Sequence, residues 1–312
     1  MGLSPILAQQ TEREREQQFT YYWHAARQAK EAGQYDRALM LLLQCEQLNP
    51  KDAITLETIG LLYYGTNRKI QAINYITRAF YLDPGERWQT YYQLLDLIGG
   101  DDPDTQKQQL DALEIAAKAN PDNVEIWEAL VTIYAPRGDW NNTFHALDRI
   151  ETLQGAQARC AQARHRIYRY LKDDKKAQAA LEDYLKVDPG NTDILEQLLD
   201  FLFDKDAPLK KVRPFFERYV ALGGKDAAMY NNYAWLLATN KTELDYAETL
   251  ALRALNYDAY DANYIDTYAW ILHLQGKRDQ ARYFIRQALQ QATPGSALSQ
   301  EIQKHYNIIY KK

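Results

Sequence analysis

A dipeptide of Asn or Asp followed by proline recurs along this chain at a regular interval. It occurs as Asn49-Pro50, Asp83-Pro84, Asn120-Pro121 and Asp188-Pro189. The prolines lie 34, 37 and 68 residues apart, and 68 is twice 34, so the period is 34 with a small insertion in one unit. Proline disfavours helical geometry in the residue before it and has no backbone N–H, so each dipeptide is predicted to end a helix. A chain divided in this way is expected to stack similar units, each in contact mainly with its neighbours.

The stretch from Gln18 to Pro50 defines the unit. Its first helix is predicted to end near Glu31, and the break falls at Ala32-Gly33-Gln34. A second helix is predicted from about Tyr35 to Leu48. Each unit is therefore a helix, a turn and a helix.

Small residues recur at fixed places in these predicted helices, where a larger side chain would hold the two helices of a unit apart. They also recur two helical turns further on, where the next unit must approach. The first helices carry Ala26, Gly60, Ala234 and Ala269, and the second helices carry Ala38, Ala72, Ala177, Ala247 and Ala281, followed by Cys45, Ala79, Ala254 and Ala288.

On this period and this row of small residues, the chain resembles a tetratricopeptide repeat (TPR) protein of bacterial type over nearly all of its length. The resemblance implies an all-α fold, a right-handed superhelical α-solenoid of about eight helix-turn-helix units. We place the solenoid at 11–294 and a capping helix at 295–312, with units near 18–51, 52–85, 86–121, 122–156, 157–189, 190–225, 226–260 and 261–294.

Two units depart from the pattern. The third carries Gly99-Gly100-Asp101-Asp102-Pro103 between its helices, which predicts an extended loop. The sixth has Pro208 and Pro214 around its second helix and Gly223-Gly224 after it, which predicts a bend or a weak joint.

The start of the chain has two features. Residues 1–10 form a short apolar piece followed by polar sequence, and two interpretations stay open: a disordered start, or the remnant of a secretory signal peptide cleaved after Ala8. Thr11 and Glu14 have the spacing of a capping box, so the first helix is predicted to begin at Thr11. A signal remnant would place the protein in the periplasm or bacterial envelope, and the alternative is the cytoplasm.

Composition excludes several classes of function. Net charge is −5 with both signs interspersed, so the basic surface that nucleic acids require is missing and no nucleic-acid partner is expected. No run reaches the 18 apolar residues of a membrane span, so no transmembrane segment is expected. Cys45 and Cys160 are the only cysteines, and both are expected to be buried and unpaired.

Motifs for catalysis are absent from the sequence. There is no HExxH, no glycine-rich phosphate loop and no CxxC, and the five histidines lack metal-ligand spacing. We therefore expect no enzyme activity, no catalytic residues, no metal and no cofactor.

Two groups of residues are candidates for partner binding on the first-helix face that lines the groove of TPR proteins. Arg159, Gln162, Arg166 and Arg169 share one face of a helix and could hold a carboxylate or an acidic peptide. The alternative is a solvated face paired with acidic residues of neighbouring units.

The second group is the repeated tripeptide Tyr-Ala-Trp at positions 233–235 and 268–270. The register directs Trp235 and Trp270 toward the groove, either as peptide anchors or as packing between adjacent helices. Further candidates lie near them or in the first unit: Asn231, Asp266, His273, Trp23 and Arg27. The Lys and Asn clamp by which some TPR proteins hold chaperone C-termini is missing, because Trp23 and Arg27 occupy the first-unit positions.

The sequence thus favours a non-enzymatic scaffold or adaptor that binds a protein or an extended peptide in its groove. Two alternatives stay open: a solenoid that binds a small anion or glycan, with or without enzymatic activity, and a self-assembling structural array. The identity of the partner and the oligomeric state do not follow from the sequence.

Overall fold

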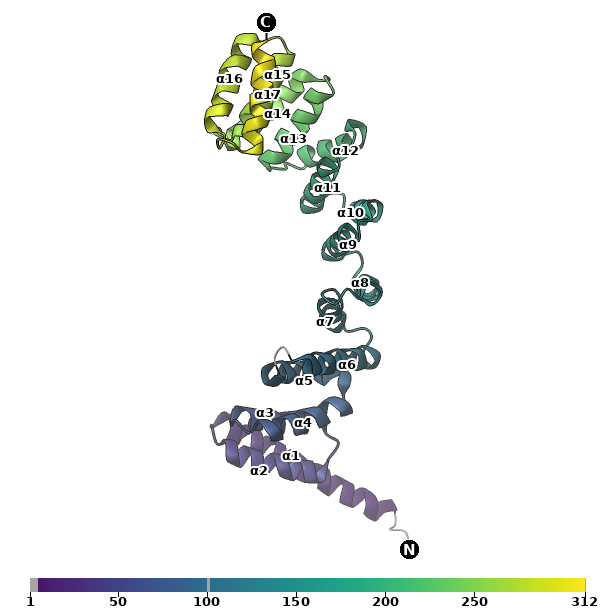
Figure 1. Ribbon diagram of the computed structural model, residues 1–312. Helices are drawn as coiled ribbons and strands as arrows, with labels where there is room; N and C mark the ends of the chain where they lie inside the picture. The colour runs from purple at the N-terminus through teal and green to yellow at the C-terminus, as the bar shows by residue number, and fades with distance from the viewer. Residues whose placement is uncertain (1–4, 100–101, 312) are drawn as a thin grey trace. The chain divides into compact units, whose positions relative to one another are not determined.

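The computed structural model describes residues 5–99 and 102–311, with side chains from Thr11 onward, and over these residues it is helical without strands (Figure 1). The all-α repeat fold predicted from the sequence is confirmed. The part of the N-terminal prediction that concerns residues 1–4 lies outside the described residues.

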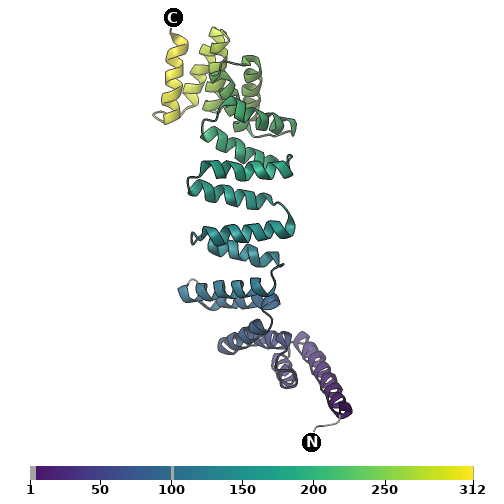
Figure 2. The same cartoon turned by 90° about the vertical axis from the view of Figure 1, so that its right-hand side faces the viewer.

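The helices follow one another as antiparallel pairs, which Figure 2 shows from the side. The pairs are α1 (Pro5–Glu31) with α2 (Tyr35–Leu48), α3 (Ala53–Gly65) with α4 (Lys69–Leu82), α5 (Pro84–Gly99) with α6 (Pro103–Ala119), α7 (Val124–Tyr134) with α8 (Trp140–Gln154), α9 (Ala158–Tyr170) with α10 (Asp174–Val187), α11 (Thr192–Asp204) with α12 (Leu209–Ala221), α13 (Ala227–Thr239) with α14 (Leu244–Tyr257), and α15 (Ala262–Leu274) with α16 (Arg278–Gln291). The single helix α17 (Ala297–Tyr310) follows, with Ser296 as its N-cap, as predicted for a capping helix.

Helix ends fall where the Asn/Asp-Pro dipeptides predict them. The helices α2, α4, α6 and α10 each end one residue before the dipeptide, and its Asn or Asp is the C-cap. Helix starts use side-chain caps: Asp52, Asn191 and Asp261 each accept a hydrogen bond from a backbone N–H two or three residues further on.

The predicted start of the first helix at Thr11 is wrong. Helix α1 already includes Pro5, so Thr11 lies inside the helix. Residues there have backbone hydrogen-bond partners within the helix, and a capping box is not needed.

Every small residue of the predicted row is buried. At Gly60 the reason is direct, because a Cβ added there would lie 2.5 Å from Cγ1 of Ile76 on the partner helix α4. The row therefore sets how closely the two helices of a pair and the adjacent pairs approach.

The extended loop predicted in the third unit is wrong. Helix α6 begins at Pro103, four positions after Gly99 ends α5, and α2 begins four positions after α1 ends. The extra residues of this unit lengthen its helices, since α5 has 16 residues and α6 has 17.

The sixth pair contains buried aromatic side chains, although α11 and α12 contact one another less than the helices of the other pairs do, so the bend or weak joint predicted from its prolines and glycines stays a prediction. Pro208 is the N-cap of α12, and Pro214 lies within that helix. Phe216 is fully buried and stacks on Tyr233 with ring centroids 3.9 Å apart. A Cβ at Gly224 would lie 2.1 Å from the Tyr219 ring, so the glycine admits close packing there.

The helices fall into two compact units, Met1–Gly155 and Ala156–Lys312, which are described separately. Each has its own core: Leu42 and Ile59 belong to a core cluster of the first, and Leu198 and Phe216 to that of the second. Cys45 and Cys160 are buried and form no disulfide, as predicted. In the described part of the chain, no helix combines the length and apolar character that a membrane span requires.

Candidate functional site

The first helices of successive pairs touch one another in the unit Ala156–Lys312. Helix α11 contacts α13, α13 contacts α15, and α15 contacts α17. One register position recurs on α9, α11, α13, α15 and α17 at intervals of 34, 35, 35 and 35 residues, which we call the register row: Arg166, Asp200, Trp235, Trp270 and His305. Residues at equivalent positions of stacked helices lie on one face, so the part of the row from Asp200 to His305 marks a continuous surface.

Three rings of this row converge. The centroid of the His305 imidazole lies 4.7 Å from that of Trp270 and 5.4 Å from that of Trp235, and the two indoles are 6.4 Å apart. Both tryptophans are half-buried. We call Trp235, Trp270 and His305 the ring cluster; it offers aromatic surface to solvent while its rings hold one another in place.

A buried carboxylate fixes the imidazole of the cluster. Asp266 is only 4% exposed, and its Oδ2 and Oδ1 lie 2.8 and 3.0 Å from Nδ1 of His305. Burial raises the pKa of the Asp266 carboxyl, and the bond to His305 opposes that rise. The capping helix α17 is thereby tied to α15 through one polar contact inside the aromatic surface.

The other two predicted neighbours of the tryptophans also lie here. The ring of His273 is 5.4 Å from Trp270, and partial burial lowers the pKa of His273, with Arg278 adding to the shift. Asn231 is 2% exposed, and its Oδ1 accepts no hydrogen bond among the described residues. Of these two side chains, only that of His273 reaches the partly exposed surface.

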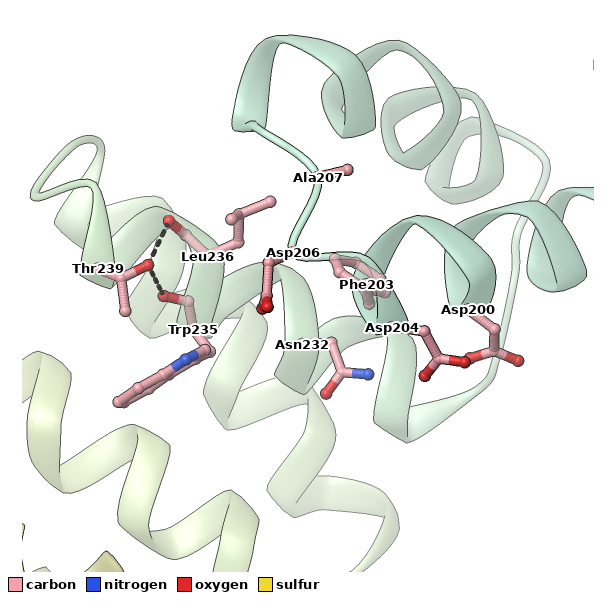
Figure 3. Close-up of a pocket in the computed structure, with 9 residues that line it drawn as sticks. All are labelled: Asp200, Phe203, Asp204, Asp206, Ala207, Asn232, Trp235, Leu236 and Thr239. Carbon is pink, nitrogen blue, oxygen red and sulfur yellow. Dashed lines mark hydrogen bonds between the residues drawn. The ribbon is translucent and has the colours of Figure 1, made fainter. Parts of the chain in front are cut away.

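An open cleft of about 550 Å³ adjoins the ring cluster and shares Trp235 with it. Its lining comes from α11, from the turn after α11 and from α13 (Figure 3): Asp200, Phe203, Asp204, Asp206, Ala207, Asn232, Trp235, Leu236 and Thr239. The volume is in the range of ligand sites. An aromatic wall, an apolar floor and three carboxylates therefore meet in one hollow.

The cleft is negatively charged. Asp204 pairs with Arg169 at 3.4 Å, with both side chains about half exposed, whereas Asp200 and Asp206 have no cation within 4 Å among the described residues. Partial desolvation and the carboxylates of Asp226, Asp204 and Glu196 raise the pKa of Asp200, because neighbouring negative charge disfavours its ionised form.

The predicted arginine row lies on one helix, α9, but it is not a free cationic surface. Arg159 and Arg166 are exposed, Gln162 is half-buried, and Nε of Arg166 donates to the carbonyl of Gln162. Arg169 pairs with Asp204 of the next unit and lies 5.8 Å from the centroid of Phe201. At Arg169 the structure has the ion pairing that the alternative interpretation of the row predicts.

In the unit Met1–Gly155, Trp23 and Arg27 line a small pocket of about 160 Å³ with Ala26, Lys30, Leu42 and Thr58. Trp23 is stacked parallel to Phe19 at 6.4 Å, and Arg27 forms an exposed ion pair with Glu31 at 3.3 Å.

Sequence reasoning missed His305, Asp200, Asp204 and Asp206. The spacing of Trp235 and Trp270 holds the signal for two of them, because one further step of 35 residues reaches His305 and one step back reaches Asp200. No sequence pattern predicts the cleft itself, since its shape depends on how α11 and α13 pack.

The side chains that line the cleft can bind a partner. Within residues 5–99 and 102–311, no group of three or more His, Cys, Asp or Glu side chains could hold a metal ion. The groups that face the cleft are carboxylates, an amide and aromatic rings, which recognise a partner by charge, hydrogen bonds and apolar contact.

Comparison with known proteins agrees with the fold. The tetratricopeptide repeat family profile matches residues 55–86. Among solved structures, YrrB, described as a TPR protein with an unusual peptide-binding site, is 19% identical with a TM-score of 0.50 over 62% of this chain and 98% of its own. The C-terminal part of a TPR repeat-containing protein from Cytophaga hutchinsonii is 14% identical with a TM-score of 0.50 over 78% of this chain and 98% of its own. At these identities the likeness shows the fold alone. No curated protein matches the sequence.

Proposed function

Because this chain is a tetratricopeptide repeat protein, we propose that it is a scaffold that binds an extended peptide segment of a partner protein. The binding surface is the ring cluster together with the adjoining cleft, on the first helices of the unit Ala156–Lys312. Repeat folds of this kind generally serve protein interaction.

One observation carries the proposal: the indoles of Trp235 and Trp270 contact one another and His305 but are only half-buried, beside an open cleft. Aromatic residues of the core are shielded from solvent, since Tyr230 and Tyr233 on α13 are fully buried. Partly exposed tryptophans beside a hollow are the usual anchors of protein interfaces, because an incoming group removes a large apolar area from water. The peptide-binding site named for YrrB is an analogy in the same direction.

A synthetic array of randomised peptides, acetylated and amidated at their ends, tests the proposal. The full chain is applied to the array, and the affinity of retained peptides is measured by fluorescence anisotropy. Replacing Trp235 and Trp270 with Ala should lower the affinity by about tenfold or more, since interface tryptophans commonly contribute at least 2 kcal/mol. Far-UV circular dichroism must show the helices intact.

Tyr257→Ala is the matched control, because this tyrosine is 52% exposed on a second helix, α14, and lies outside the cleft and cluster. It should leave the affinity unchanged. The proposal is wrong if no peptide is retained, or if the double tryptophan variant stays folded and binds as well as the wild type.

The place of this scaffold in the bacterial envelope is a separate proposal that comes from the apolar residues 1–8. Fractionation of cells that express the natural gene tests it. Recovery of the protein in the cytoplasm alone would contradict it.

A further inference from the structure

Building on the peptide-binding function above, we propose that the cleft between α11 and α13 takes a basic side chain of the partner peptide, with arginine preferred. The cationic group would lie among Asp200, Asp204 and Asp206, and its aliphatic stem would lie along Trp235 and Leu236. The ring cluster would take an apolar neighbour of that residue.

Charge complementarity is the first reason. Three carboxylates line the cleft and one cation, Arg169, pairs with one of them, so two negative charges have no ion-pair partner in the described part of the chain. The ion pair at Asp204 shows that a guanidinium is accommodated at the rim of this hollow. A partner with a positive charge relieves the repulsion, whereas a phosphate or an acidic side chain would add to it.

The walls of the cleft are the second reason. Leu236 and Phe203 are half-buried, Ala207 is buried, and the half-buried indole of Trp235 stands at the junction with the ring cluster. Long basic side chains bury their methylene groups on apolar surface while the head stays hydrated. A cation over an indole face is attracted further by the ring quadrupole.

Hydrogen-bonding capacity is the third reason. The Asn232 amide faces the cleft and has no partner among the described residues, so it can bond a peptide backbone. The Thr239 hydroxyl is already engaged, because it donates to the carbonyls of Trp235 and Leu236 (Figure 3). Arginine is preferred to lysine because its planar fork can bond two carboxylates and stack on the indole together.

The test uses the peptide array described above, with the full chain. Peptides with capped ends carry positive charge only on side chains, so enrichment of arginine and lysine among retained peptides reports a basic side chain in the site. The charge-neutralised variant is Asp200→Asn with Asp206→Asn. Asparagine keeps the size of both residues and suits the left-handed backbone of Asp206, where φ is 47°.

The control is Asp193→Asn with Asp279→Asn, which removes the same charge from exposed first-turn positions of α11 and α16 outside the cleft. We expect the cleft variant to bind basic peptides about tenfold more weakly or worse, since each lost bond is charge-assisted. The control variant should bind within about twofold of the wild type because its charges are exposed and screened.

Each other outcome contradicts this inference. If retained peptides lack basic residues, or if the cleft variant binds basic peptides as the wild type does, the cationic partner is rejected while peptide binding stands. If the control variant loses as much affinity as the cleft variant, general charge and not the cleft is responsible. If no peptide is retained, the inference falls together with the proposed function.

Discussion

Removal of the His305 imidazole is expected to lower the stability of the capping helix α17, and the structure gives the size of the loss. His305→Ala deletes a ring 4.7 and 5.4 Å from two indoles and leaves the Asp266 carboxyl, 4% exposed, without its partner at 2.8 Å. A hydrogen bond involving a charged group contributes about 1.5–3 kcal/mol, and a ring pair about 0.5–1.5 kcal/mol. Because Asp266 can take up a proton to relieve part of the burial cost, we expect a total near 2–4 kcal/mol.

Amide hydrogen exchange in α17 measures the free energy of opening of this helix alone. A local measurement is preferable in a repeat protein because its helix pairs can unfold separately. A loss of about 2–4 kcal/mol should speed exchange in α17 roughly 30-fold to several hundredfold. Exchange in α3 and α4, in the other compact unit, should not change.

Two further variants separate the polar contact from the packing. His273→Ala removes an imidazole 5.4 Å from Trp270 that has no carboxylate partner among the described residues, so it should cost only about 0.5–1.5 kcal/mol. Asp266→Asn combined with His305→Ala should cost less than the sum of the two single changes, because no buried carboxylate is left unpaired. Equal effects of His305→Ala and His273→Ala, or strict additivity with Asp266→Asn, would refute the role assigned to the buried bond.

Four other substitutions test packing and burial. Gly60→Ala should destabilise the α3–α4 pair by about 1–2 kcal/mol, because overpacking against Ile76 outweighs the gain in helix propensity. Gly65→Ala should stabilise the same helix, α3, by about 0.5–1 kcal/mol, because its added Cβ meets no atom of another element within 4 Å. Hydrogen exchange that ranks the two variants in the opposite order would contradict this reasoning. Phe216→Ala should cost about 3–5 kcal/mol in urea unfolding, and a cost below about 1 kcal/mol would support the weak joint predicted from the prolines. Burial raises the pKa of Cys45 from 9.0 to about 11, so the stability that its protonated thiol contributes is complete below pH 9 and is lost as the pH rises through 11. Urea unfolding at a series of pH values should show that the wild type loses stability more steeply at alkaline pH than Cys45→Ala does. Parallel curves of unfolding free energy against pH would contradict the shift.

The sequence by itself determined the fold. Each Asn/Asp-Pro dipeptide follows the end of a helix, because the proline ring and its missing N–H act on the residues next to it. The small residues at Ala38, Gly60 and Ala234 likewise predict where helices pack closely. They recur with the period of the repeat, and only a small side chain allows two helices to approach so closely. Predictions failed at Thr11, where a capping pattern lies inside a helix, and at the third unit, where extra residues lengthen helices instead of a loop.

The candidate site was decided by the tertiary structure. The sequence placed Trp235 and Trp270 on one face, and the period also contains His305 and Asp200, but the distance between their rings depends on how successive first helices are stacked. The pairing of Arg169 with Asp204 joins residues 35 positions apart and removes one of the arginines from the predicted cationic row. The cleft is a gap left by the side chains of α11, α13 and the turn between α11 and α12, and the shape of such a gap follows from packing in three dimensions, not from any local pattern of residues.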